Sequence, residues 1–240
     1  APVRPDDPFL YLFTGGSAGS PRPVRVRHRR FVAAGAVLAP LLGITADDVV
    51  YAPLPLSHAA GNLLGFAVAL HAGAAFASRR RSTPASCLDD LHRHGASVLV
   101  HAGELCRYLL REPPRAADRS HRLRLAVGAG LRRDVWDAFR DRFAVPRIVE
   151  VYGHTGGSVA LLNLSGRVGS VGRPLPGLGR DVRLARCDPA SGDLVRDADG
   201  FLAACAAGEA GELLCRVRET PLLRHEGFLD PQATAARVVR

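Results

Sequence analysis

Short apolar runs alternate with longer amphipathic segments along most of this sequence, and this alternation constrains the fold more than any other feature. Runs that are apolar at every position are typical of strands buried on both faces, and such strands occur mainly in parallel sheets covered by helices. We therefore predict an α/β fold with a largely parallel sheet flanked by helices. The predicted strands are residues 9–14, 49–54, 74–78, 96–102, 123–128 and 147–153, the first of them as a buried strand.

The segments between these runs have helical character. A helix is predicted over 28–43, with Pro40 and Gly43 in its last turn, and another opens at Ser82 or Thr83 with Pro84 in its first turn. The remaining predicted helices cover 61–73, 103–110 and 132–143. From about Leu161 the pattern changes to short strands separated by glycine turns, which indicates a smaller β-rich subdomain.

The basic charge of the chain is a weak guide to its partners. The net charge is +9, and it comes wholly from arginine because the sequence has no lysine. The arginine clusters at 25–30 and 79–81 lack interleaved aromatic residues, so we predict no nucleic-acid partner. Two interpretations stay open for these clusters, peripheral contact with anionic lipid head groups or a solvated face, and the sequence favours the second.

Cysteine usage and hydropathy predict a cytoplasmic location, with membrane association left open. The five cysteines are odd in number and form no C-x-x-C pair, which favours reduced thiols over a disulfide framework or a metal site. The most apolar window, residues 63–77, is short for a bilayer span and contains His71 and Gly73. We predict a buried helix that runs into a buried strand there.

Three loops that follow apolar strands are the candidate binding regions, because ligands of parallel sheets bind at the carboxyl ends of the strands. The loop Thr14–Arg22 combines hydroxyl groups, glycines and one guanidinium, which suits a polyphosphate, although glycine-rich connections without ligands are common. The turn Gly128–Gly130 is the second. The third, Tyr152–Gly157, offers an aromatic face to a purine and the Thr155 hydroxyl to a phosphate, or only a structural tyrosine and a turn threonine.

In their order and spacing these stretches resemble the adenylate-forming, acyl-activating superfamily. "TGGSAGSPR" from Thr14 is similar to its phosphate loop, and "YGHTG" from Tyr152 is similar to its Y-G-x-T-E signature. Within the superfamily the chain looks most like the fatty acid transport protein and very-long-chain acyl-CoA synthetase family. The motifs that indicate this family are "LPLSHAAGNLLG", "GELCRYLL", "LRLAVGAGL" and "GRVGSVGR", so the resemblance covers nearly the whole chain.

The resemblance implies an AMP-forming fatty acyl-CoA ligase of lipid metabolism and fatty acid uptake. Its substrates would be a long-chain or very-long-chain fatty acid, ATP and coenzyme A, with Mg²⁺ as cofactor. Thr155 would contact the α-phosphate as the catalytic residue. The residues implied to bind the nucleotide are Thr14, Gly15, Gly16, Ser17, Ala18, Gly19, Arg22, Gly128, Gly130, Tyr152 and Gly153, and those implied to lie near the acyl chain are His58, Ala60, Gly61 and Gly103. His58 is equally well interpreted as a hydrogen-bonded core histidine.

The chain departs from the superfamily pattern at several positions. The residue after Thr155 is Gly156, where the superfamily has a glutamate that helps to bind Mg²⁺, so that metal contact is lost. In the phosphate loop Gly15 stands for serine, Ala18 for a hydroxyl residue and Arg22 for lysine. Single transition-state charge contacts are worth about 3 kcal/mol, so these changes should slow adenylation severely. We do not expect Glu150 to compensate, since it lies within the predicted strand.

The resemblance also implies that the chain is a fragment of a larger enzyme. Residues 1–160 would form part of the α/β AMP-binding core and residues 161–240 a truncated β-rich subdomain. The mobile C-terminal domain of the family, with its catalytic lysine, would be absent. We expect such a fragment to be inactive by itself, and a nucleotide-binding or acyl-binding pseudoenzyme without catalysis remains the alternative.

Overall fold

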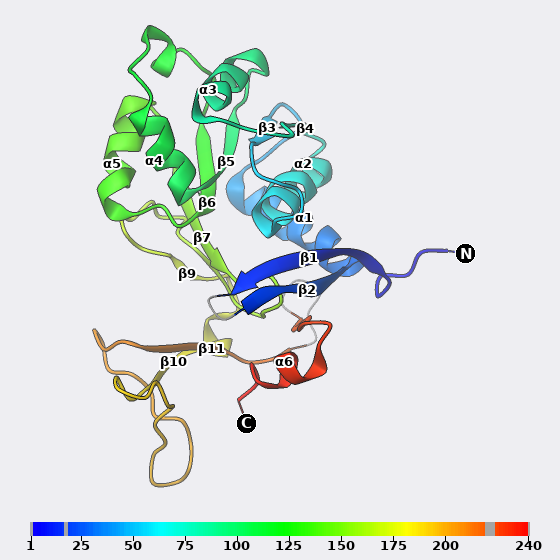
Figure 1. The fold of residues 1–240 in the computed structure, drawn as a ribbon, viewed down its shortest axis with the longest axis vertical. Coiled ribbons are helices and arrows are strands. Elements are labelled where there is room, and N and C mark those ends of the chain that lie inside the picture. The colour runs from blue at the N-terminus through cyan, green and yellow to red at the C-terminus, as the bar shows by residue number, and fades with distance from the viewer. Residues whose placement is uncertain (1, 17–18, 219–223, 240) are drawn as a thin grey trace.

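The computed structural model describes residues 2–16, 19–218 and 224–239, and its centre is a seven-stranded sheet (Figure 1). The strand order is β4-β3-β5-β6-β7-β8-β9. The five strands from β4 to β7 are parallel, and β8 and β9 are antiparallel to their neighbours. These strands are β3 (Val49–Ala52), β4 (Ala75–Ser78), β5 (Val98–Ala102), β6 (Leu125–Ala129), β7 (Ile148–Gly153), β8 (Ala160–Leu162) and β9 (Arg173–Pro174). The predicted largely parallel sheet is confirmed.

Helices cover both faces of this sheet, as predicted. In Figure 1, α1 and α2 lie on one side, and α3, α4 and α5 lie on the other. Val98, Val100 and Val127 point into the apolar cluster under α1 and α2, whereas Leu99 and Ala126 belong to the cluster under α3–α5. The helices are α1 (His28–Leu42), the π-helix η1 (Ala60–Phe66), α2 (Ala67–Ala72), α3 (Pro84–Arg93), α4 (Gly103–Arg111), the 3-10 helices η2 (Ala116–Arg119) and η3 (Gly179–Asp181), α5 (Arg133–Arg142) and α6 (Pro231–Ala235).

Local signals explain where several helices begin and end. Helix α3 is capped by Thr83, whose hydroxyl accepts a hydrogen bond from the Ser86 N–H at 3.1 Å, while Pro84 occupies the first turn. Helix α1 ends at Gly43, which adopts a left-handed conformation with φ of 65°. Both ends were predicted from the sequence. The segment predicted as one helix over 61–73 instead starts as the π-helix η1 and continues as α2.

The prediction of a buried strand at residues 9–14 is wrong in its burial. The segment belongs to β1 (Pro8–Gly16), which pairs with β2 (Gly19–Arg27) as a separate antiparallel hairpin outside the main sheet. Leu12 is buried, but Phe9, Tyr11 and Phe13 are 37%, 46% and 61% exposed. The apolar run therefore has only one covered face, because a two-stranded hairpin packs against the rest of the protein on one side.

The last part of the chain adds two smaller features. Strands β10 (Val182–Arg186) and β11 (Gly211–Cys215) form a second antiparallel hairpin. Residues 224–236, which include α6, lie beside the β1–β2 hairpin (Figure 1), and the Leu229 N–H donates to the Pro23 carbonyl at 3.0 Å. The β1–β2 hairpin and this late segment are thus neighbours, although they are far apart in sequence.

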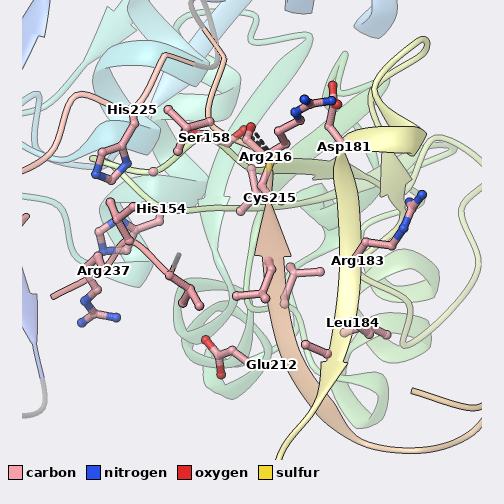
Figure 2. Close-up of a pocket in the computed structure, with 18 of the residues that line it drawn as sticks. His154, Ser158, Asp181, Arg183, Leu184, Glu212, Cys215, Arg216, His225 and Arg237 are labelled. Atoms are coloured by element: carbon pink, nitrogen blue, oxygen red, sulfur yellow. Dashed lines mark hydrogen bonds between the residues drawn. The ribbon is translucent and has the colours of Figure 1, made fainter. Parts of the chain in front are cut away.

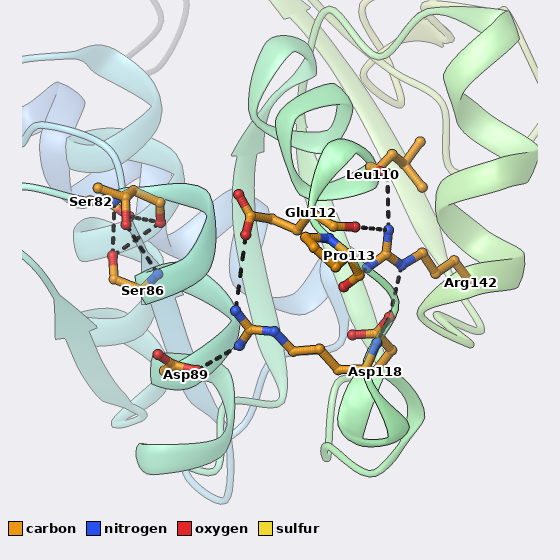
Figure 3. Close-up of polar contacts among 10 residues, drawn as sticks. Ser82, Ser86, Asp89, Leu110, Glu112, Pro113, Asp118 and Arg142 are labelled. Carbon is orange, nitrogen blue, oxygen red and sulfur yellow. Dashed lines mark hydrogen bonds and ion pairs between the residues drawn. The ribbon is translucent and has the colours of Figure 1, made fainter.

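One arginine fastens the end of α5 to the segment that follows α4. The Arg142 guanidinium donates to the carbonyl oxygens of Leu110, Glu112 and Pro113 at 2.9, 2.8 and 3.1 Å (Figure 3). It also pairs with the nearly buried Asp118 carboxylate at 2.8 Å. A planar guanidinium has five donors, which suits this combination of three carbonyls and one carboxylate.

Arg142→Ala is expected to lower the free energy of unfolding by about 3 kcal/mol, because it leaves the buried Asp118 carboxylate without its partner. The matched control is Arg140→Ala on the same helix, where the ion pairs with Asp137 and Asp141 are exposed and a much smaller loss is expected. Urea unfolding of both variants measures the difference. Equal losses would contradict the role given to Arg142.

Candidate functional site

The parallel pairing of β6 and β7 brings two of the three predicted loops together. Gly128 pairs with Glu150 in this register, so the turn after β6 lies beside the end of β7, where Tyr152 is located. The Tyr152 side chain is not buried, since the residue is 43% exposed, so its ring is available to a ligand. Gly128, Gly130, Tyr152 and Gly153, all predicted to bind nucleotide, thus share one edge of the sheet.

The turn at 128–131, called the Gly130 turn below, is in direct backbone contact with the start of α4. A Cβ at position 103 would lie 1.7 Å from the Gly130 carbonyl oxygen, and one at position 128 would lie 2.0 Å from the His101 carbonyl oxygen. Only glycine permits approaches this close. Gly103, predicted from the family pattern to lie near the acyl chain, is therefore adjacent to Gly130, predicted to border the base.

The Gly130 turn is also held by a carboxylate that the sequence did not reveal as part of the site. The Gly130 and Leu131 N–H groups donate to the side chain of Glu150, which is 5% exposed. Burial raises the pKa of Glu150 to about 6, while the two N–H groups act in the opposite direction. No sequence motif indicates this contact, because a glutamate inside an apolar run is interpreted only as a strand residue.

The predicted phosphate loop is the tip of the β1–β2 hairpin. Thr14 pairs with Arg22 across the hairpin, and the Thr14 hydroxyl donates to the Arg22 carbonyl at 3.3 Å. Gly16 pairs with Gly19. The predicted phosphate ligands Ser17 and Ala18 lie outside the described residues, and Gly15 is described only as part of β1.

The β1–β2 hairpin and the Tyr152–Gly157 loop meet around residues 224–229. The Gly227 N–H donates to the Gly156 carbonyl at 3.2 Å, and the Phe228 ring lies 6.1 Å from the His154 ring. The Arg22 guanidinium lies 5.7 Å from the centroid of the same Phe228 ring. Two of the predicted loops therefore share one neighbour, which the sequence analysis did not identify because "HEGFLDPQAT" shows no clear periodicity.

Positive charge accumulates around Gly157. The buried Arg30 guanidinium donates to the Gly157 carbonyl at 3.4 Å, and Arg27 forms an ion pair with the buried Glu226 carboxylate. Burial, followed by the positive charges of Arg237 and Arg30, lowers the pKa of His154, and burial lowers the pKa of His225 as well. His154 is therefore neutral at pH 7, and the region presents arginine rather than histidine charge to a ligand.

A pocket of about 810 Å³ opens beside this loop (Figure 2). His154, His225 and Arg237 line one side of it, and Arg183 and Arg216 lie on the β10–β11 side. At its upper end the Cys215 thiol donates to the Ser158 carbonyl at 3.3 Å. Among the predicted ligand-binding residues that the structure describes, Tyr152 borders the pocket, whereas Thr14, Gly128, Gly130, Gly153 and Thr155 do not line it.

The predicted acyl-site residues fall into two groups. Gly103 lies at the Gly130 turn, whereas His58, Ala60 and Gly61 lie at the start of η1, which packs against β3, β5 and β6. His58 is exposed, and its Nδ1 accepts a hydrogen bond from the Ala60 N–H at 3.1 Å. The alternative of a core histidine is therefore wrong. Gly61 is needed by the fold, since a Cβ there would lie 2.6 Å from the Pro55 carbonyl oxygen.

The residues at the loop do not fit a bound Mg²⁺. Position 156 offers no side-chain oxygen, and the Glu150 carboxylate is already engaged with the Gly130 turn. In the part of the chain that the structure describes, His, Cys, Asp and Glu side chains form no cluster of three that could hold a metal.

Within the described residues, no helix combines the length and the apolar character needed to cross a bilayer.

Comparison with known proteins identifies similar sequences. The sequence profile described as "AMP-binding enzyme" matches residues 1–220. Human long-chain fatty acid transport protein 1 is 37% identical over 237 residues, covering 97% of this chain and 36% of that protein. Long-chain fatty acid transport protein 5 from Homo sapiens is 39% identical over 223 residues, covering 92% of this chain and 32% of that protein. The chain thus spans about one third of the length of these relatives.

Solved structures agree in fold. ATP-bound MatB from Rhodopseudomonas palustris matches with a TM-score of 0.75 and 21% identity, over 97% of this chain and 43% of that one. O-succinylbenzoate coenzyme A synthetase from Bacillus subtilis, in complex with AMP, matches with a TM-score of 0.73 and 20% identity, over 98% and 45%. A malonyl-CoA ligase with methylmalonyl-CoA and AMP bound has a TM-score of 0.71 and 27% identity, over 97% and 48%.

Gly103→Ala is expected to lower the free energy of unfolding by about 2 kcal/mol or more, since the new methyl group meets backbone atoms of Gly130 that cannot rotate away. Gly179→Ala is the control, because nothing lies within 4 Å of a Cβ at that position. Urea denaturation of the two variants provides the comparison. A Gly103→Ala protein as stable as the control would show that the backbone contact is not as close as described.

Proposed function

The chain belongs to the AMP-binding enzyme family, and from that premise we propose that it is the nucleotide-binding part of an enzyme that activates long-chain fatty acids with ATP. The observation that carries the proposal is the meeting of the Gly130 turn with the end of β7. A base could lie against the exposed Tyr152 ring with the Gly130 turn as its neighbour. Gly103, next to Gly130, would then place the acyl site beside the nucleotide.

The proposed reaction has two steps. The fatty acid carboxylate attacks the α-phosphate of ATP, which forms an acyl-adenylate and releases pyrophosphate. The thiol of coenzyme A then attacks the acyl carbonyl, which forms the thioester and releases AMP. Such reactions depend on positioning and on compensation of negative charge. The first step makes the poor electrophile, a carboxylate, reactive by giving its carbon a phosphate leaving group.

The chain's own residues would contribute positioning and charge. Thr155 would donate its hydroxyl to the α-phosphate, and the hairpin tip from Thr14 to Arg22 would hold the β- and γ-phosphates. Arg22 is exposed and its guanidinium lies 5.7 Å from the Phe228 ring, so it could reach a phosphate at the hairpin tip. Because the residues present do not fit Mg²⁺, we assign no step to the metal. The proposal also keeps the division of the chain into an AMP-binding core at residues 1–160 and a β-rich subdomain at residues 161–240.

A non-catalytic nucleotide-binding protein is the second candidate, and the surroundings of Gly156 favour it. A Cβ at position 156 would lie 3.2 Å from the Gly227 carbonyl oxygen and 3.4 Å from a Val24 methyl group. A Cβ at this position would therefore need the Gly227 backbone to shift by a few tenths of an ångström, whereas its approach to Val24 is close to an ordinary van der Waals contact. The close Gly227 backbone is consistent with a protein that has no carboxylate here.

Several arginines of the two clusters are engaged within the protein, which supports a structural role for these arginines over contact with lipid head groups. Arg29 pairs with Asp6 and Arg27 with Glu226, while Arg30 is buried. In the second cluster Arg79 pairs with the buried Asp90 at 2.6 Å. A cytoplasmic protein with at most peripheral membrane contact is the location we propose.

Tyr152→Ala is expected to weaken binding of ATP about tenfold, because the base loses the aromatic face on which it stacks. Tyr108→Ala is a matched control, since Tyr108 is 46% exposed on α4 and Tyr152 is 43% exposed. Isothermal titration of ATP into each protein measures both constants. Wild-type chain that fails to bind ATP, or two variants that bind equally, would contradict the nucleotide site.

The 240-residue chain is expected to show no fatty-acid-dependent ATP–pyrophosphate exchange, because position 156 lacks a carboxylate and the chain spans one third of its relatives. Radiolabelled pyrophosphate with palmitate and ATP is the assay. A chain that binds ATP without exchange fits both candidates. Measurable exchange would rule out the non-catalytic candidate and show that Gly156 is compatible with adenylation.

A further inference from the structure

Glu150 is a buried carboxylate whose hydrogen bonds all run to one turn. Its Oε1 accepts from the Gly130 N–H and from the Leu131 N–H at 3.1 Å, and Oε2 lies 3.3 Å from the same Leu131 nitrogen. Hydrogen bonds from backbone N–H groups to a charged carboxylate are stronger than those between neutral groups. The contact links β7 to the turn after β6, twenty positions earlier in the chain.

The position of Glu150 relates this turn to the proposed base site. Glu150 and Tyr152 are two residues apart on β7, so their side chains leave the strand on the same face. Gly130 has φ of 82°, a left-handed conformation, and its carbonyl is packed against Gly103 at the start of α4. The turn is therefore held on one side by the α4 backbone and on the other by the carboxylate.

We propose that the Glu150 carboxylate is a positioning group that holds the Gly130 turn at the right place beside Tyr152 for a nucleobase to bind. This inference rests on the proposed function, since it assumes that a base lies between the turn and Tyr152. Glu150 does not touch the ligand. It acts by accepting hydrogen bonds from two backbone N–H groups. Without these bonds the turn would be free to adopt other left-handed or extended conformations.

Two other roles for a buried glutamate are less consistent with the contacts. A metal-binding role would need lone pairs directed away from the turn, but both oxygens face the backbone nitrogens. A purely structural role, in which Glu150 stabilises the sheet, conflicts with its electrostatics. Burial raises its pKa from 4.5 to about 6, so keeping the carboxylate charged at pH 7 costs folding free energy.

The groups that face Glu150 do not titrate in the same range. His101 of β5 lies in the same row of the sheet, across Gly128, and burial lowers its pKa to about 4. Cys106 of α4 is close enough to sense the charge of Glu150, and burial raises its pKa. Both are neutral between pH 5 and pH 7.5, so Glu150 is the group in this cluster whose charge changes there.

The first test measures the turn directly by hydrogen exchange. In Glu150→Gln, which keeps the shape but removes the charge, the Gly130 and Leu131 amides are expected to exchange about tenfold faster than in the wild type. Glu209→Gln is the matched control. Glu209 also accepts from a backbone N–H in a turn, that of Ala206 at 2.8 Å, but on the distant loop before β11. Its substitution should accelerate only its own turn.

The second test measures adenosine affinity against pH, because adenosine carries no phosphate that would titrate in this range. Wild-type affinity is expected to fall at least threefold as the pH is lowered from 7.5 to 5, whereas Glu150→Gln should bind weakly and independently of pH. If Glu150 served only to stabilise the fold, lowering the pH would strengthen its contribution instead of weakening it. The folded state binds the Glu150 proton more tightly than the unfolded state, so its contribution to the free energy of unfolding rises as the pH falls from about 6 to 4.5.

The two tests separate this inference from the proposed function. Unchanged exchange at Gly130 and Leu131 in Glu150→Gln overturns the positioning role, whatever the ligand. Faster exchange together with adenosine affinity equal to the wild type overturns it as well, because the order of the turn would then be irrelevant to the base. A wild-type chain that binds neither adenosine nor ATP overturns the proposed function, and with it the assumption on which the inference rests.

Discussion

Close contact between backbones at the carboxyl edge of the sheet is the constraint on which the candidate site depends. A Cβ at position 103 would overlap the Gly130 carbonyl, and one at position 128 would overlap the His101 carbonyl, so neither position can carry a side chain. The start of α4 thereby lies against the turn after β6, and that turn is hydrogen-bonded to Glu150 near the end of β7. The covered faces of the parallel sheet provide the stability, while these contacts decide which loops can share a ligand.

Much of the fold could be predicted because its signals are local. Apolar runs fixed the parallel strands, Thr83 and Pro84 marked the start of α3, and Gly43 marked the end of α1. The burial of the first strand could not be predicted, since an apolar run in β1 looks the same whether one or both faces are covered. The start of η1 as a π-helix also has no local signal, and it coincides with the tight approach of Gly61 to Pro55.

The candidate site was predicted in part, and the missing part is non-local. The motif resemblance identified the loops that carry Gly130 and Tyr152, and parallel pairing explains why they are neighbours. It identified neither Glu150 nor Phe228, because their partners lie far away in the sequence. Gly156 was recognised as a departure from the family pattern. Only the structure relates it to Gly227, whose carbonyl oxygen would lie 3.2 Å from a Cβ at position 156.

The contact between the β1–β2 hairpin and the segment 224–229 has a consequence for how the protein folds during synthesis. Arg27 and Glu226 are separated by 199 positions, yet their ion pair joins the β1–β2 hairpin to the segment 224–229. During synthesis the hairpin leaves the ribosome long before Glu226 is added to the chain, so Arg27 has no ion-pair partner while the central strands fold. Contacts that close so late are slow to form and expose their surfaces meanwhile. Nascent chains stalled before residue 226 should therefore be the species most in need of a chaperone.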